Sequence, residues 1–172
     1  PRRPKLSYDP RASGPGNLFN GKIAPLMPFA IRGAVWYQGE SNARTAVNGR
    51  LYAKQLPLLI QDWRTRWGQG DFPFAWVQLP KFHGKSFAGW CEARESMLKT
   101  LSLPNTGMAV TIDSGDVVDI HPKNKPEVGR RLALWALAKV YGQEISFSGP
   151  LPAGHEIKGA EVICTFTHAE GL

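Results

Sequence analysis

Two polar segments of this 172-residue chain carry the side chains that could do chemistry. The later segment, residues 113–124, reads DSGDVVDIHPKN and places His121 among several aspartates. An imidazole can take a proton from a nucleophile near neutral pH and return it to a leaving group. A carboxylate on its second nitrogen would fix the tautomer and stabilise the imidazolium. His121 is therefore the candidate base, with Asp119 and Asp116 as candidate acids.

Two other interpretations of this segment stay open. In the first, the histidine and the acids are only turn and helix-cap residues that bond nearby backbone. In the second, the ionisable side chains hold a metal ion through carboxylate oxygens and one imidazole nitrogen. The spacing matches neither an EF-hand nor an H-E-x-x-H pattern, so metal binding ranks low. The four side chains in question are Asp113, Asp116, Asp119 and His121.

The earlier polar segment is QGESNA, residues 38–43, directly after the apolar run FAIRGAVWY. Ser41 stands there in a G-x-S-x-A frame, close to the nucleophile elbow of serine hydrolases. Gln38 and Glu40 could contact substrate hydroxyls or make loop hydrogen bonds. The local pattern leaves open whether Ser41 attacks a substrate or whether this loop has another role.

Alternating strand and helix patterns must position these two segments. Each apolar strand-like run is followed by a loop and then by apolar residues spaced three and four apart, which indicates amphipathic helices. This order predicts an α/β fold with a mainly parallel sheet, in which sites form at the carboxyl ends of the strands. The predicted strands are 29–37, 72–79 and 107–113, and the predicted helices are 49–67, 90–101 and 125–141.

Individual residues predict where the helices begin, bend and end. Asn124 with Glu127 three residues later is typical of a capping box. Gly68 and Gly142 are placed to end their helices. Pro57 removes a backbone donor and predicts a kink.

The composition divides the chain into three parts. Residues 1–16, rich in Pro, Gly and Arg, predict an extended segment, and residues 17–142 predict the α/β domain. Residues 143–172 predict the first strands of a β-rich domain that continues beyond the chain. Cys91 and Cys164 lie far apart without a C-x-x-C pair, so we expect lone buried thiols.

The formal charge of +7 is spread along the chain, without a dense basic block interleaved with aromatic residues. This pattern favours a solvated basic surface over a nucleic-acid site. No apolar run has the length of roughly 20 residues that a membrane span needs. The start of the chain also lacks the apolar stretch of a signal peptide.

The stretches RGAVWYQGESNA and DIHPKNKPEVGRRLA together resemble the sialate O-acetylesterase family of SGNH/GDSL-type hydrolases. Supporting stretches are LFNGKIAPLMPFA, LIQDWRTRWG, PFAWVQLP and EARES, so the resemblance extends from about Asn17 to Gly142. It implies a three-layer α/β/α fold with an incomplete sheet. It also implies a serine esterase that removes O-acetyl groups from sialic acid or a related sugar. In this resemblance Asn42 and Gly39 match the oxyanion block, and His121 matches the base.

The chain departs from the family pattern in two places. No stretch before Gly33 looks like the block that carries the nucleophilic serine, since neither Ser7 nor Ser13 follows an apolar strand. We therefore expect a fragment whose nucleophile lies in a missing N-terminal part. The family's D-x-x-H spacing would also place the acid at Val118. The acid is then Asp119, or else Asp116, or a backbone carbonyl orients the histidine instead.

The resemblance further implies an acetylated sugar as the substrate, no cofactor or metal, and an extracytoplasmic setting. The missing N-terminal part would be the partner of this chain. Two alternatives remain: an α/β-hydrolase with Ser41 as nucleophile, and a non-catalytic carbohydrate-binding module or inert remnant.

Overall fold

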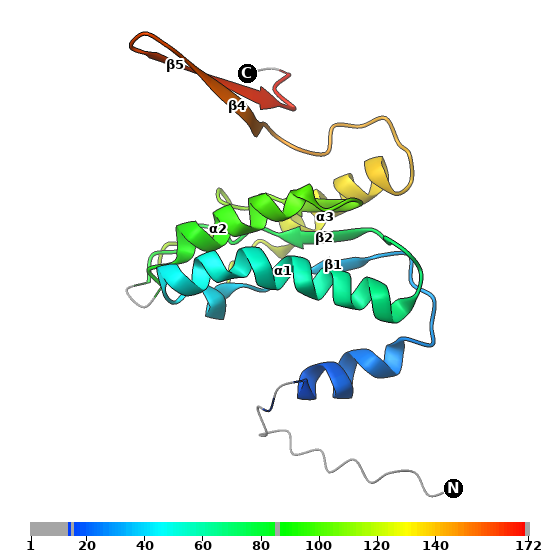
Figure 1. Ribbon diagram of the computed structural model, residues 1–172. Helices are drawn as coiled ribbons and strands as arrows, with labels where there is room; N and C mark the ends of the chain where they lie inside the picture. Colours follow the sequence, from blue (N-terminus) through cyan, green and yellow to red (C-terminus); the bar gives the residue numbers. More distant parts are fainter. Residues whose placement is uncertain (1–13, 15, 85–86, 171–172) are drawn as a thin grey trace, which may run out of the picture.

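The computed structural model describes residue 14, residues 16–84 and residues 87–170 (Figure 1). Three strands form a parallel sheet in the order β1-β2-β3, and their bounds are β1 Ala34–Trp36, β2 Phe74–Val77 and β3 Thr106–Ala109. Three helices join or follow them, with bounds α1 Ala46–Trp67, α2 Trp90–Lys99 and α3 Lys125–Lys139. The predicted alternation of strand, loop and helix is confirmed.

The helices cover both faces of the sheet. α1 and α2 pack together on one face, whereas α3 lies on the opposite face (Figure 1). All four residues of β2 are buried, as expected for a central strand covered on both sides. Gly107 of β3 allows α3 to approach, because a methyl group at this position would collide with the indole ring of Trp135. The predicted three-layer α/β/α architecture is confirmed.

The main core lies between α1 and the sheet. Tyr52, Leu56 and Ile60 are spaced by four residues on α1 and are almost fully buried. They pack in one cluster with Phe74 and Trp76 of β2. Burying a side chain of this size contributes about 1.5–3 kcal/mol, and truncating Ile60 to alanine would cost about 2–5 kcal/mol.

The helix ends follow the local sequence. Thr45 caps α1, because its Oγ1 accepts a hydrogen bond from the Asn48 N–H at 3.1 Å. Gly68 ends the same helix at a φ of 65°, and α1 runs as one helix through Pro57. Asn124 caps α3 by accepting from the Glu127 N–H at 3.3 Å, as predicted.

A short segment before the sheet contacts α1 through Phe19. It contains a π-helical turn, Phe19–Ile23, and a 3-10 turn, Ala24–Leu26. The Arg66 guanidinium of α1 lies 4.9 Å from the ring centroid of Phe19.

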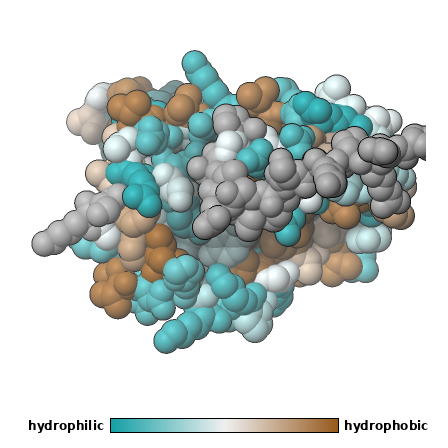
Figure 2. All heavy atoms as spheres, turned by 90° about the horizontal axis from the view of Figure 1, so that it is seen from below, coloured by the Kyte–Doolittle hydropathy of each residue, from teal (hydrophilic) through white to brown (hydrophobic). Residues whose placement is uncertain are grey.

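Seen from below, the molecule exposes hydrophobic patches among hydrophilic side chains (Figure 2). The extended segment predicted for residues 1–16 falls almost entirely outside the described residues.

After α3, strands β4 (Leu151–Lys158) and β5 (Glu161–Thr167) form an antiparallel hairpin as a separate sheet. The strands predicted in this region are present. Phe147 of the linker contacts both the His168 ring, with centroids 4.8 Å apart, and the Lys139 Nζ, which lies 4.6 Å from its centroid. No helix in the described ranges is long and apolar enough to cross a membrane.

The prediction of buried cysteines is wrong. Cys91 and Cys164 are both exposed, and neither forms a disulfide. Cys91 lies at the solvent side of α2, whereas Trp90, Ala93 and Met97 are the apolar α2 residues that enter the core. Cys164 lies on β5, all of whose residues are exposed.

Candidate active site

The loop after β1 turns sharply at Gly39 and continues as a 3-10 turn, Glu40–Ala43. Gly39 is buried and has a φ of 148°, and a methyl group there would lie 2.7 Å from the Met97 Cε. Only glycine fits such a position without strain. Ser41 lies within the 3-10 turn and is exposed. The strained residue is therefore two positions before Ser41, which differs from a nucleophile elbow, where the serine itself occupies the sharp turn.

A row of hydrogen bonds holds the side chains of this loop. The Trp36 Nε1–H donates to the Tyr52 hydroxyl at 3.2 Å, and this hydroxyl donates to the backbone O and the Oε1 of Gln38, each at 3.1 Å. The Gln38 Nε2 donates to the Asn42 Oδ1 at 2.8 Å. The Asn42 Nδ2 in turn donates to the Gln55 Oε1 at 2.7 Å. Gln38 thus bonds Asn42 directly.

Sequence reasoning did not assign three members of this row, Trp36, Tyr52 and Gln55, to the site. Tyr52 stands at an apolar spacing within the predicted helix 49–67, which indicates a core residue, and Gln55 carries no signal in the sequence. Both lie on α1, so only the packing of α1 beside the loop brings them to Asn42. Burial is the main cause that raises the pKa of Tyr52; the Trp36 hydrogen bond lowers it, the Glu40 carboxylate raises it, and the resulting value is about 12. The Tyr52 hydroxyl therefore stays protonated and keeps its hydrogen for Gln38.

The loop after β3 places the two candidate acids in different roles. Asp116 accepts backbone hydrogen bonds from Val118 at 2.9 Å and Asp119 at 3.3 Å, and these bonds lower its pKa. Asp119 accepts from the His121 N–H at 2.9 Å, and its Oδ1 lies 3.5 Å from the His121 Nδ1. Asp116 therefore shapes the loop, whereas Asp119 is the carboxylate beside the imidazole. The His121 side chain is 88% exposed.

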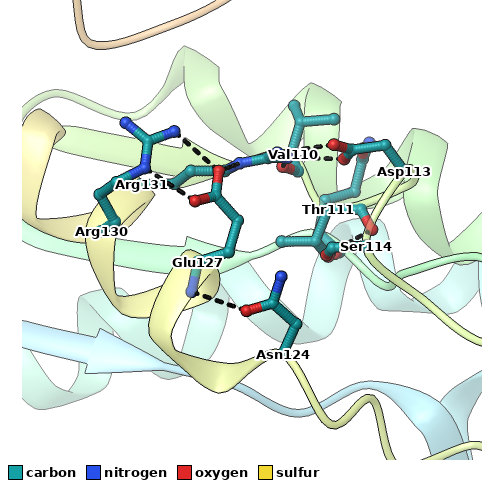
Figure 3. Close-up of polar contacts among 9 residues, drawn as sticks. Val110, Thr111, Asp113, Ser114, Asn124, Glu127, Arg130 and Arg131 are labelled. Atoms are coloured by element: carbon teal, nitrogen blue, oxygen red, sulfur yellow. Dashed lines mark hydrogen bonds and ion pairs between the residues drawn. The ribbon is translucent and has the colours of Figure 1, made fainter.

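Arg131 of α3 ties this loop to the sheet (Figure 3). Its guanidinium donates to both carboxylate oxygens of Asp113 and to the Val110 carbonyl, each at 2.6 Å, and to Glu127 at 2.7 Å. The Arg131 hydrogen bonds lower the pKa of Asp113 to about 2. Asp113 is thus engaged by a cation. Within the described part of the chain no group of three His, Cys, Asp or Glu side chains could hold a metal ion.

The half-buried Arg94 of α2 bonds backbone carbonyls of the segment that follows β2. Its guanidinium donates to the Leu79 carbonyl at 2.8 Å and to the Pro80 carbonyl at 2.5 Å. Glu95 pairs with Lys99 at 2.7 Å. Arg94 therefore fixes the chain that leaves β2, between the two polar loops.

The parallel sheet brings both polar loops to its carboxyl edge. A contact between them supports this placement, because the Lys125 Nζ at the start of α3 lies 4.5 Å from the ring centroid of Tyr37, the neighbour of Gln38. A cavity of about 350 Å³ lies elsewhere, where Thr106 begins β3, and it is lined by Trp135 and Phe147.

Comparison with known proteins identifies the family. A family model described as a carbohydrate esterase, sialic acid-specific acetylesterase, matches residues 19–138. The chain belongs to this family. The sialate O-acetylesterase of Mus musculus is 38% identical over 185 residues, which cover 94% of this chain and 34% of that protein. The sialate O-acetylesterase of Homo sapiens is 34% identical over 195 residues, covering 100% of this chain and 37% of that protein.

A solved structure supports the family fold. The crystal structure of a carbohydrate acetylesterase from Xanthomonas citri matches with a TM-score of 0.81 and 42% sequence identity. The match covers 87% of this chain and 35% of that chain. The chain therefore spans about a third of the length of the acetylesterases that it matches, and the family match over residues 19–138 includes both polar loops.

Proposed function

We propose that this chain supplies His121 and Asn42 to a serine-type esterase that removes O-acetyl groups from sialic acid or a related acetylated sugar. The family of the chain and the names of its relatives support the reaction class. One observation carries the proposal. The loops that bear the His121–Asp119 pair and the hydrogen-bonded Asn42 amide both follow strands at the carboxyl edge of the sheet.

In the proposed reaction a serine oxygen attacks the acetyl carbonyl carbon while the His121 imidazole takes the serine proton. The carbonyl oxygen becomes an oxyanion, which the Asn42 NH₂ stabilises by a hydrogen bond that is stronger in the transition state than in the ground state. His121 then protonates the leaving sugar oxygen, and the acetyl group stays on the serine. Water, deprotonated by His121, releases acetate and restores the serine. No step requires a metal ion or a cofactor.

Three residues support this chemistry from the loops. Asp119 orients His121 through the contact with its Nδ1. Gly39 provides the turn that brings the following residues to the sheet edge. Glu40 remains a candidate contact for a sugar hydroxyl.

The proposed nucleophile lies outside the described residues. Ser7 and Ser13 also lie outside them, and the polar contacts of His121 within the described ranges are both with Asp119. We propose that a preceding segment of the protein brings the serine to this edge. We also propose that residues 143–172 begin a separate β-rich domain.

The test uses the complete polypeptide that the gene encodes, an acetylated sialic acid and an activated acetyl ester. His121→Ala should lower kcat by at least about 1,000-fold, because it removes the base. His155→Ala is the matched control, since His155 is exposed on β4. A fluorophosphonate should label a serine other than Ser41, and labelling at Ser41 would support the elbow mechanism instead. Absence of turnover and labelling would favour a non-catalytic role.

A further inference from the structure

We propose that the hydrogen-bonded row from Trp36 through Tyr52 and Gln38 to Asn42 and Gln55 sets the direction of the Asn42 amide. Its members other than Asn42 are positioning residues, which ensure that Asn42 offers its NH₂ and not its carbonyl oxygen to the substrate. This inference rests on the proposed oxyanion role of Asn42. It adds Trp36, Tyr52 and Gln55 to the proposed site and gives Gln38 a positioning role.

The direction matters because the two ends of an asparagine amide differ in polarity. The NH₂ carries two donor hydrogens, whereas the carbonyl oxygen only accepts. A reversed amide would place a partial negative charge against the developing oxyanion. Among the described residues, the Gln55 Oε1 takes one of the two hydrogens on the Asn42 Nδ2, so the second hydrogen can serve the oxyanion.

The row has a defined starting point. An indole N–H can only donate, so Trp36 occupies a lone pair of the Tyr52 hydroxyl. The single hydrogen of that hydroxyl then faces the two oxygens of Gln38. With its Oε1 turned to Tyr52, Gln38 presents its Nε2 to the Asn42 Oδ1, and the Asn42 Nδ2 is left facing Gln55.

The first half of the row is more buried than the second. Tyr52 is 3% exposed and belongs to the core, and Trp36 and Gln38 are half-buried. Gln55 is exposed, so its bond to Asn42 competes with water. We therefore infer that the direction of the amide is determined chiefly from the side of Tyr52 and Gln38.

The same substitution at the two glutamines tests the direction. Glutamate only accepts, so Gln38→Glu removes the donor that faces the Asn42 Oδ1, whereas Gln55→Glu keeps the acceptor that faces the Nδ2. We expect Gln38→Glu to lower kcat about 100-fold, comparable to the loss of an oxyanion donor, and Gln55→Glu to lower it by less than about threefold. The KM should change little in either variant.

The two variants add the same charge next to Asn42, so their difference reports the direction of the bonds. Gln61→Glu is the control, because Gln61 lies on α1 and is exposed. Activity of the complete polypeptide and the melting temperature are measured for each variant. A larger loss in Gln55→Glu than in Gln38→Glu, or equal losses, would overturn the inference.

A double-mutant cycle separates this inference from the proposed function. If Tyr52 acts through Asn42, Tyr52→Phe should lower kcat about tenfold in the wild type and have no further effect when Asn42 is already alanine. A purely structural tyrosine would lower kcat equally in both backgrounds, and this result would overturn the inference. If Asn42→Ala itself leaves kcat unchanged, the oxyanion role in the proposed function fails. If Asn42→Ala lowers kcat while Tyr52→Phe does not, only the row fails.

Discussion

Replacing Arg131 by methionine should loosen the loop that carries His121. The substitution keeps much of the aliphatic stem but removes the guanidinium that bonds Asp113, Val110 and Glu127 (Figure 3). The Asp113 side chain is 61% exposed, so we assign its ion pair about 0.5–1 kcal/mol. The bond to the half-buried Val110 carbonyl adds about 1–1.5 kcal/mol. We expect a loss of about 2 kcal/mol in the free energy of unfolding.

Urea unfolding followed by tryptophan fluorescence measures this loss, and the melting temperature should fall by about 4–8 °C. Arg130→Met is the matched control, because Arg130 is exposed and its guanidinium bonds Glu127. Amide hydrogen exchange should also become faster at Val118 and His121 in Arg131→Met. Equal unfolding midpoints for the two variants, with unchanged exchange in the loop, would refute the reasoning.

Three further predictions concern the loops and α1. Gly39→Ala should lower the free energy of unfolding by about 3 kcal/mol, because it adds backbone strain and a clash with the Met97 methyl group. Gly129 lies in open space on α3, so the control Gly129→Ala should raise the free energy of unfolding by up to about 1 kcal/mol. Thermal unfolding measures both variants. The pKa of Tyr52 rises from 10.0 to about 12 on folding. The contribution of the protonated Tyr52 hydroxyl to the free energy of unfolding is therefore complete below pH 10 and is lost as the pH rises toward 12. Wild type and Tyr52→Phe should differ over this range by up to about 3 kcal/mol in urea unfolding, and parallel curves would contradict the assignment. Asp119→Asn should lower kcat at least about tenfold, because Asp119 lies beside the His121 imidazole. Asp116→Asn should change kcat by less than about threefold, because asparagine can accept the same two backbone amide bonds. Equal losses of kcat in steady-state assays would contradict the separate roles of the two acids.

The sequence predicted the layers of the fold because periodicity reports which residues face a core. The spacing of Tyr52, Leu56 and Ile60 indicated the buried side of α1, and Asn124 and Gly68 marked helix ends through local hydrogen bonding and backbone conformation. The exposure of Cys91 was not predictable from its residue type. It depends on which side of α2 faces α1 and the sheet.

For the site, the sequence by itself determined which residue types are present and that two polar loops follow parallel strands. Their chemistry and order also carried the family resemblance, and the family is confirmed. Only the tertiary structure decided that Asp119, and not Asp116, lies beside His121, and that Tyr52 and Gln55 hold the loop of Asn42. These contacts join residues on separate elements or depend on the exact path of a loop, and neither leaves a periodic signal in the sequence.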